Sequence, residues 1–358
     1  MKKNLIMAAS VAAAFILASC NKQFDKAPCY VETSGQAELS LSLAGCNQTK
    51  ATEVGSDAEN AVGTVDVFVF YKGGEYDGRL DAYAHFDSAP YNLSATTGDK
   101  TIYAVVNSEH SEAVLGAIST KAELLAKLAS LSSQKDASEK PGLFTMIGSV
   151  NRTAATSNAL VAGVNSVSVT VDRLVSRVRL LKITRDFESV ALAAQDFSVD
   201  EVYLSNVVTV EEYGSGHTPV PDDFVNQLGV PSAAYDAWLR KTVSSNLANG
   251  ESKSFADASG CMYAMPNLID SDSEETPFTV RNTKLVVKAT LAGKGVYYVI
   301  PLGAIRSNTT YDIGELVITR PGSSGPDQKT EIASCTFTID VNPWTVVPVE
   351  TESGKYVI

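Results

Sequence analysis

The sequence predicts an all-β protein with minor helices, arranged as two β-sandwich domains. Short segments rich in β-branched and aromatic residues recur along the chain, separated by Gly- and Pro-containing turns. Helical spacing of apolar residues is confined to two stretches, 111–132 and 221–242. A chain of 358 residues is long enough for two domains of ordinary size. Many short strands with one helical excursion in each half favour two sandwiches.

The N-terminus has the form of an export signal. Met1-Lys2-Lys3 is a basic start, and the apolar run that follows, residues 5–17, is too short to span a bilayer. The run ends in Leu17-Ala18-Ser19-Cys20. Small residues before a cysteine resemble the bacterial lipobox, in which the cysteine becomes the lipidated first residue. We therefore expect residues 1–19 to be a lipoprotein signal peptide and Cys20 to carry the lipid, which anchors a protein without spanning the membrane.

The first strand lies shortly after this leader. Within residues 37–45, Leu39, Leu41 and Leu43 alternate with polar residues, which places the three leucines on one face of a strand. A polar segment containing one basic residue, Lys50, follows. The segment is either the ordinary first strand of a β-domain or a strand removed by a protease that cuts nearby.

Further strands are expected on both sides of a domain boundary near Val171-Asp172. Before it they cover residues 61–71, 79–86, 91–96, 101–107, 143–150 and 160–171, and after it residues 173–184, 197–210, 261–265, 279–291, 294–302, 310–319 and 334–341. One or two helices are expected over 111–132, with Ser119-Thr120 offering an N-cap hydroxyl. A long insertion, Val210 to Gly260, contains the helical patch Pro221 to Thr242; an insertion of this length is either functional or decoration.

The last predicted strand has the alternation of the first. Cys335, Phe337, Ile339 and Val341 alternate with polar residues, and Trp344 and Val346 follow. Proline cannot donate a ladder hydrogen bond, so Pro343 and Pro348 are expected to bound the strand rather than lie inside it. This segment is either the last strand of its own domain or a strand that can pair with another subunit.

Composition and motifs argue against several functions. The net charge of −12 makes nucleic acid an unlikely partner. No GxSxG, HExxH or phosphate-binding glycine loop occurs, and the single SxxK match, Ser132 to Lys135, lacks its partner motifs. We therefore expect no catalytic residues and no cofactor. No metal site is expected either, because the carboxylates from Asp270 to Glu275 lack the glycine and spacing of an EF-hand. Four cysteines besides Cys20 could form disulfides: Cys29, Cys46, Cys261 and Cys335.

Several segments together resemble the Bacteroidales fimbrillin family, the major subunits of type V pili. The similar segments are Val65 to Phe70, Thr97 to Asn107, Phe144 to Gly148, Arg173 to Val178, Met262 to Asn267 and Ile305 to Ile313. They occur in the family's order over nearly all of the chain that follows the leader. Residues 319–326 stand in place of the family's Gly-rich turn.

The resemblance implies two transthyretin-like β-sandwich domains and a maturation pathway. It assigns residues 20–50 to a propeptide with a removable first strand, residues 51–171 to the N-terminal domain and residues 172–358 to a C-terminal domain with a polymerising strand. Cleavage maps onto Lys50–Ala51, where this chain has Lys in place of a common Arg. The removed strand contains Leu39, Leu41 and Leu43, and the donor strand contains Phe337, Ile339, Val341, Trp344 and Val346.

The implied function is that of a structural subunit of a surface fimbria that supports adhesion. Its partners would be other fimbrial subunits, a maturation protease, the cell outer membrane through the lipid of the precursor, and a host receptor. The alternative is a tip adhesin or an unpolymerised surface lipoprotein that binds glycan or host protein, with residues 210–260 as its adhesive element. An enzyme is the least supported class.

Overall fold

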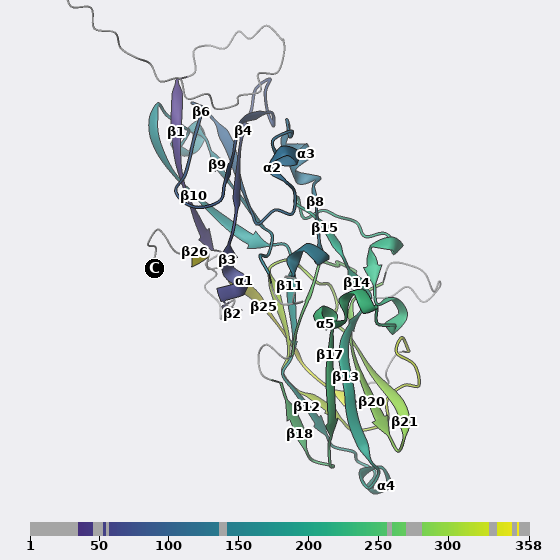
Figure 1. Ribbon diagram of the computed structural model, residues 1–358. Coiled ribbons are helices and arrows are strands. Elements are labelled where there is room, and N and C mark those ends of the chain that lie inside the picture. Colours follow the sequence, from purple (N-terminus) through teal and green to yellow (C-terminus); the bar gives the residue numbers. More distant parts are fainter. Residues whose placement is uncertain are drawn as a thin grey trace, which may run out of the picture. The chain divides into compact units, whose positions relative to one another are not determined.

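β-strands dominate the part of the chain that the computed structural model describes, which is residues 35–45, 53–54, 57–135, 142–255, 260–269, 281–328, 335–345 and 349–350 (Figure 1). The α-helices among these residues have four or five residues each: α1 (Asp57–Asn60), α2 (Glu112–Leu115), α3 (Lys121–Leu125), α4 (Val190–Ala193) and α5 (Asp236–Leu239). The predicted all-β class with minor helices is confirmed. None of the helices in the described ranges has the length and apolarity needed to cross a membrane.

The first half of the chain forms a seven-stranded sheet in the order β5-β4-β7-β9-β10-β1-β6. Its strands are β1 (Gln36–Gly45), β4 (Val65–Tyr71), β5 (Leu80–Phe86), β6 (Tyr91–Thr96), β7 (Lys100–Val106), β9 (Met146–Arg152) and β10 (Gly163–Arg173). Apolar residues from both ends of this order meet in one core, in which Val67 and Ile102 lie with Leu39, Leu93 and Val169. The part of the sheet that contains β4 and β7 therefore packs face to face with the part that contains β10, β1 and β6, as in a sandwich.

The pattern of β4 explains why it lies near the centre of its part of the sheet. Its sequence VDVFVFY is buried on both faces, with Val65, Val67 and Val69 in the first core. Phe68 and Phe70 point to the other face, into a second core that continues through the rest of the chain. A strand covered on both sides reads as an apolar run rather than as an alternation.

The rest of the chain forms three further main sheets, in the orders β19-β11-β22-β25-β2, β18-β12-β23-β24 and β17-β13-β20-β21. Their strands are β2 (Glu53–Val54), β11 (Ser176–Leu180), β12 (Lys182–Arg185), β13 (Phe197–Ser205), β17 (Arg240–Asn246), β18 (Ser252–Ser254), β19 (Cys261–Ala264), β20 (Lys284–Leu291), β21 (Lys294–Pro301), β22 (Thr309–Ile313), β23 (Leu316–Ile318), β24 (Cys335–Thr336) and β25 (Ile339–Thr345). Three two-stranded pairs complete the fold: β3 (Ala61–Val62) with β26 (Val349–Glu350), β8 (Leu128–Ser130) with β15 (Val210–Glu212), and β14 (Val207–Val208) with β16 (Phe224–Val225).

Helical structure follows the prediction in the first half and departs from it in the second. The helical spacing over 111–132 corresponds to α2 and α3, and the expected N-cap is present as a capping box between Thr120 and Glu123. The helical patch predicted over Pro221 to Thr242 is wrong. That stretch consists of 3₁₀ turns, the short helix α5 and the regular strand β17. Phe224, Trp238 and Leu239 of this stretch are buried, whereas Val230 is 65% exposed, so its apolar residues do not form the single buried face of a helix.

The two halves of the sequence share continuous structure. β10 runs through the expected boundary at Val171-Asp172 and ends at Arg173, where it pairs with β9. In addition β8 from the first half pairs with β15 from the second, at Ala129↔Glu211. The division into two domains therefore stays a proposal, and the sheets on either side of it are bonded together.

Gly148 marks a close approach between β9 and β10. A β-carbon built on Gly148 would lie 1.7 Å from the carbonyl oxygen of Thr170 and 3.0 Å from the Cα of Val171. These atoms belong to backbone, which cannot move aside as a flexible side chain can. Only glycine fits where β9 crosses β10.

We expect Gly148→Ala to lower the free energy of unfolding by about 1–3 kcal/mol, because the added methyl group forces the strands apart. Urea denaturation followed by tryptophan fluorescence measures the change. Gly295→Ala is the matched control: Gly295 also lies in a strand, and its added methyl group would meet no atom within 4 Å. Equal effects of the two substitutions would contradict the close approach.

Candidate functional site

The strand β1 occupies an inner position in its sheet. It pairs in parallel with β10 from Ala37↔Gly163 to Gly45↔Val171, and antiparallel with β6 from Gln36↔Thr96 to Leu41↔Tyr91. Both of its edges are therefore bonded over most of its length. Figure 1 shows β1 between β10 and β6.

The predicted leucine face of β1 is buried. Leu39 is 1% exposed and Leu41 is 6% exposed, and Leu43 packs half-buried against the same core. The intervening Glu38, Ser40 and Ser42 are exposed, so the alternation seen in the sequence corresponds to the two faces of the sheet. The assigned lipid site Cys20 and the assigned cleavage site Lys50–Ala51 lie outside the described residues.

The C-terminal segment is divided rather than continuous. The strand expected over residues 334–341 consists of β24, which pairs with β23, and β25, which pairs with β22. Phe337 lies between them and is 36% exposed, and Val341 in β25 is 56% exposed. Ile339 is half-buried, and Val346 lies outside the described residues. The expected single apolar face is therefore not formed within this chain.

The expectation that Pro343 bounds the strand is also wrong. Pro343 lies within β25, opposite Thr309 of β22. On its other side β25 pairs with β2 at Trp344 and Thr345. Among the described residues none pairs with that side of β25 before Trp344, and proline is tolerated where its missing N–H faces no partner strand.

Trp344 is wholly buried and lies between two arginines. The guanidinium carbons of Arg173 and Arg177 lie 4.1 and 4.6 Å from its ring centroid. The ring of Tyr263 stacks near the indole, with centroids 6.0 Å apart, and Phe144 meets it edge-on at 5.8 Å. Contacts between a guanidinium and an indole are attractive, and more so where water is excluded.

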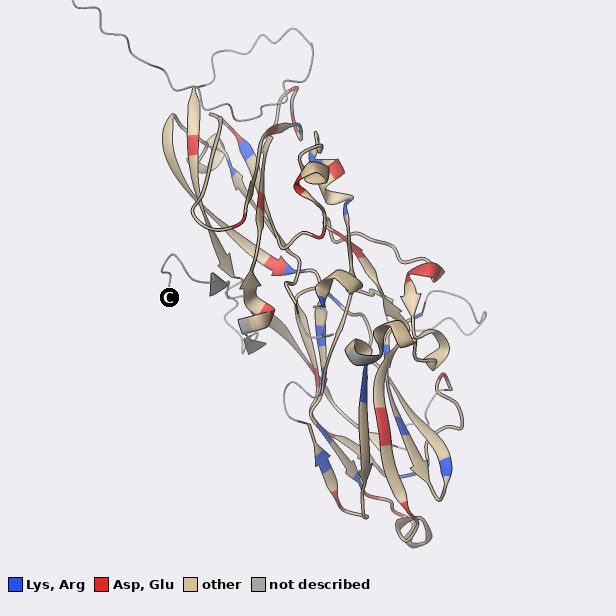
Figure 2. Ribbon diagram, in the orientation of Figure 1, with Lys and Arg blue, Asp and Glu red and all other residues tan. Residues whose placement is uncertain are grey.

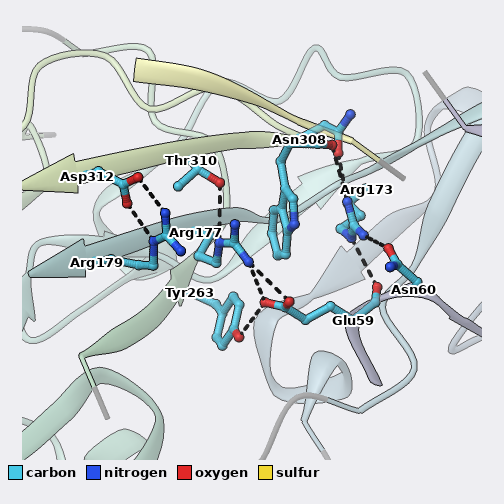
Figure 3. A network of polar contacts seen from close by, with 10 residues as sticks. Glu59, Asn60, Arg173, Arg177, Arg179, Tyr263, Asn308, Thr310 and Asp312 are labelled. Carbon is cyan, nitrogen blue, oxygen red and sulfur yellow. Dashed lines mark hydrogen bonds and ion pairs between the residues drawn. The ribbon is translucent and has the colours of Figure 1, made fainter. Parts of the chain in front are cut away.

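Arg173 joins four segments of the chain through hydrogen bonds. It donates to the backbone oxygens of Glu59 (3.1 Å) and Trp344 (3.3 Å), and to the side-chain oxygens of Asn60 and Asn308. Figure 3 shows Arg173 between Asn60 and Asn308. Its partners come from α1, the turn before β22, and β25. The end of β10 is therefore bonded to the C-terminal strand.

Arg177 and Arg179 lie on β11 and are paired with carboxylates. Arg177 donates to Glu59 at 3.1 and 3.3 Å, and Tyr263 donates its hydroxyl to the same carboxylate at 2.7 Å. Arg179 makes a two-fold contact with Asp312 of β22, at 2.6 and 2.5 Å (Figure 3). The basic segments along β11 are visible in Figure 2. Because alternate residues of a strand share a face, Arg177 and Arg179 point to the same side, away from Val178.

Asn308 fixes the turn that faces Arg173. Its backbone has φ 49°, in the left-handed region that asparagine tolerates better than most residues. Its side-chain amide donates a hydrogen bond to the Asp172 carboxylate at 2.7 Å. Its backbone carbonyl oxygen accepts a hydrogen bond from the backbone N–H of Trp344 at 2.9 Å. The same residue therefore contacts β10 and the C-terminal strand.

Burial dominates the electrostatics of this network. It lowers the pKa of Arg173 to about 9, with the Glu59 carboxylate opposing the shift and Arg177 adding to it. Burial also raises the pKa of Tyr263, and the neighbouring Cys261 and Glu59 raise it further. Glu59 and Arg177 are 4% and 5% exposed, so the ion pair is shielded from solvent. Removing one partner of such a pair leaves a buried charge uncompensated.

Cys261 and Cys335 are free and buried. Burial raises the pKa of each thiol to about 11, so both stay protonated and unreactive at neutral pH. Cys29, Cys46 and the acidic run Asp270 to Glu275 lie outside the described residues. The described ranges hold no cluster of three or more His, Cys, Asp or Glu side chains suited to a metal ion.

Residues 210–260 are part of the surrounding fold where they are described. The segment contributes β17 to the sheet that contains β13 and β18 to the sheet that contains β12. Tyr203 of β13 donates its hydroxyl to the carbonyl oxygen of Gly229 at 2.8 Å. These contacts attach the insertion along its length.

The sequence predicts β1 but not the partners of Trp344. It predicts Arg173 to Val178 as part of a strand, and the arginines at 173, 177 and 179 are the one further signal that this stretch contains. Glu59 gave no signal at all, because it lies in a polar stretch and becomes buried only through α1.

The fold is similar to that of several solved structures of β-sheet proteins from Bacteroidales. A candidate cell adhesion protein of Bacteroides eggerthii is similar with TM-score 0.61 and 17% identity, over 87% of this chain and 97% of that one. A candidate cell adhesion protein of Parabacteroides distasonis has TM-score 0.59 and 18% identity, over 89% and 98%. A fimbrilin (FimA) of Porphyromonas gingivalis has TM-score 0.55 and 13% identity, over 88% and 98%. No curated protein matches the sequence.

The model of the family described as major fimbrial subunit protein (FimA) matches residues 37–179 of this chain. The match begins in β1 and ends in β11, so it covers the seven-stranded sheet from the second residue of β1 onward. The resemblance to fimbrillins is thereby confirmed over this region. The likeness of the remaining chain to solved fimbrilins is one of fold.

We expect Glu59→Leu to lower the free energy of unfolding by about 3 kcal/mol or more, because it leaves the buried Arg177 without its carboxylate. Equilibrium denaturation in urea at pH 7 measures the loss. Glu188→Leu is the control: it removes an ion pair with Arg320 whose side chains are 63% and 52% exposed, and such pairs contribute about 0–1 kcal/mol. A loss from Glu59→Leu no larger than that of the control would contradict a structural role for the network.

Proposed function

We propose that this protein is a structural subunit of a cell-surface fimbria, exported as a lipoprotein, cut near Lys50 and polymerised by donor-strand exchange. The observation that carries the proposal is the inner position of β1. The strand that the resemblance to fimbrillins assigns as removable is bonded on both edges and buries its leucine face. It therefore occupies a slot that another strand of the same pattern would fit.

Removal of β1 would leave an empty slot in the sheet and would lower the stability of the subunit. The backbone groups of β10 and β6 that face β1 would lose their partners, and such an edge pairs readily with another strand. Each leucine withdrawn from the core would cost about 1.5–3 kcal/mol. An incoming strand with alternating apolar residues would recover both contributions. Because the slot is parallel to β10, no tight hairpin could fill it from β10 itself.

The proposal gives β1 a role during export. While it is attached, it fills the slot and keeps the subunit monomeric. A protease that cuts at Lys50–Ala51 would separate residues 20–50, including the lipid on Cys20, from the rest of the chain. The mature subunit would then be free of the outer membrane and able to accept a strand from a neighbour.

We expect Lys50→Ala to block maturation. Incubation of the full-length protein with a trypsin-like protease should trim the wild type after Lys50 and yield oligomers, visible by size-exclusion chromatography and electron microscopy. Lys50→Ala should stay uncut at this position and monomeric. Lys50→Arg is the control and should behave as the wild type. Wild-type protein that is trimmed yet stays monomeric would refute donor-strand exchange.

We expect Cys20→Ala to abolish lipid attachment, because the sulfur of Cys20 is the atom that would carry the lipid. Metabolic labelling with radioactive palmitate and membrane fractionation measure this change. The precursor should lose its label and leave the membrane fraction, whereas Cys29→Ala should keep both. Unchanged labelling of Cys20→Ala would show that another group carries the lipid.

A deletion of the residues after Val341, 342–358, distinguishes a shaft subunit from a lone binding protein. A shaft subunit lacking these residues should still be trimmed at Lys50 but should no longer form long polymers, because it has no strand to donate. A surface lipoprotein that acts alone should keep its binding to a host extract or glycan array. Normal polymers from the deletion variant would contradict the use of this segment as the donor.

A further inference from the structure

The slot of β1 is closed at the end where β1 begins. Just after β6, the backbone N–H of Thr97 donates to the carbonyl oxygen of Gly35 at 2.9 Å. The next residue, Gly98, pairs instead with Leu160, which precedes β10, through backbone hydrogen bonds of 2.8 and 3.1 Å. The two walls of the slot are therefore bonded directly to each other, and a strand in the plane of the sheet cannot continue past Gly35. We call this the closed end of the slot.

The β6 wall of the closed end is fixed by buried side chains. The Asp81 carboxylate accepts both the backbone N–H and the hydroxyl of Thr96, each at 2.9 Å. The Lys100 ammonium donates to the Thr96 hydroxyl at 2.7 Å, pairs with Asp81 at 3.0 Å and lies 3.6 Å from the ring centroid of Tyr71. These partners belong to β4, β5 and β7, so removal of β1 would leave the end of β6 bonded to three other strands.

The β10 wall of the closed end is fixed by Asn165. Its side-chain amide donates to the carbonyl oxygens of Val161 and Gly163, each at 2.8 Å, and its side-chain oxygen accepts the backbone N–H of Val161 at 3.0 Å. One longer contact, 3.4 Å to the carbonyl oxygen of Glu38, reaches β1. Most of the hydrogen bonds of Asn165 therefore lie within this wall and do not depend on β1.

The core-facing residues of β1 are small at the closed end and bulky beyond it. Ala37 is 0% exposed, and its neighbour across the ladder is the equally small Ala95. Leu39, the next residue on this face, lies opposite Leu93. Because protein interiors are close-packed, a larger side chain at Ala37 must displace core atoms, and a smaller one at Leu39 leaves a cavity.

We propose that the closed end sets the register of the strand that fills the slot. A strand supplied by a second copy of this chain must bring a residue no larger than alanine to the position of Ala37 and a bulky apolar residue to that of Leu39. A strand shifted by two residues keeps its alternation. It is nevertheless excluded, because the shift brings a bulky residue to the closed end. This inference rests on the proposed function and adds an order of side-chain sizes to the alternation.

A competition between peptides tests this order. The full-length wild type is trimmed with the trypsin-like protease in the presence of a fluorescein-labelled peptide with the sequence of residues 35–45, and fluorescence anisotropy follows its displacement by unlabelled peptides. One competitor has the wild-type sequence. The second carries Ala37→Leu with Leu39→Ala, so its composition and its alternation are those of the wild type. The third carries Ser40→Leu, which adds bulk on the exposed face of the strand.

The swapped peptide should compete at least ten-fold more weakly than the wild-type peptide, and the Ser40→Leu peptide within about two-fold of it. Equal competition by the swapped peptide would show that alternation alone is selected, and an equal loss from Ser40→Leu would show that added bulk is rejected anywhere. Either result overturns the inference, as does a labelled peptide that fails to bind while the trimmed protein forms polymers. Ordered competition on a trimmed protein that stays monomeric supports the order of sizes and refutes strand exchange between subunits.

Hydrogen exchange in the uncut chain provides a second measurement. In full-length protein, Ala37→Leu with Leu39→Ala should raise the exchange rate of the β1 backbone amides at least ten-fold and leave that of β20 unchanged. Ser40→Leu should keep the wild-type rates. Wild-type protection of β1 in the swapped variant would overturn the inference, and this result depends on neither cleavage nor polymers. If β20 also loses protection, the swapped chain is misfolded, and the peptide competition, which uses wild-type protein, decides.

Discussion

The burial of two arginines against one tryptophan is the interaction on which the centre of this protein depends. A guanidinium removed from water costs several kcal/mol unless its donors and charge are satisfied. Here the compensation comes from segments far apart in the chain: the Glu59 carboxylate, the Asn308 amide oxygen and the carbonyl oxygen and ring of Trp344. Each segment must be in place before the arginines can be buried, which makes the assembly of this region cooperative.

β1 and Trp344 are held in the fold by different kinds of interaction. β1 is held by backbone pairing and by apolar side chains in a core, interactions that any strand of similar alternation can supply. Trp344 is held by directional contacts to two particular arginines. Another strand could take the place of β1 if its apolar residues alternate in the same way. Another residue in the place of Trp344 would leave the two buried arginines without their aromatic partner.

Local sequence patterns predict an element correctly where one of its faces is buried and the other is exposed. They predict it wrongly where its structure depends on segments far away in the chain. The leucines of β1 and the capping box at Thr120 follow from alternation and short-range hydrogen bonding, and the structure has both. The apolar spacing of Pro221 to Thr242 indicates a helix, but the stretch forms 3₁₀ turns, the short helix α5 and β17. The alternation of residues 335–341 indicated one strand, but pairing with two different neighbours, β23 and β22, divides it at Phe337.

The amino-acid sequence is enough to predict the β class, the amphipathic character of β1, and the resemblance to fimbrillins that the family match confirms over residues 37–179. These depend on residues close together in the chain, since a strand shows its faces within a few residues. The folded chain is needed to show that β1 lies between β10 and β6, and that Glu59, Arg173 and Trp344 meet. Pairing partners and buried charges depend on which distant segments come together, and no local spacing records that choice.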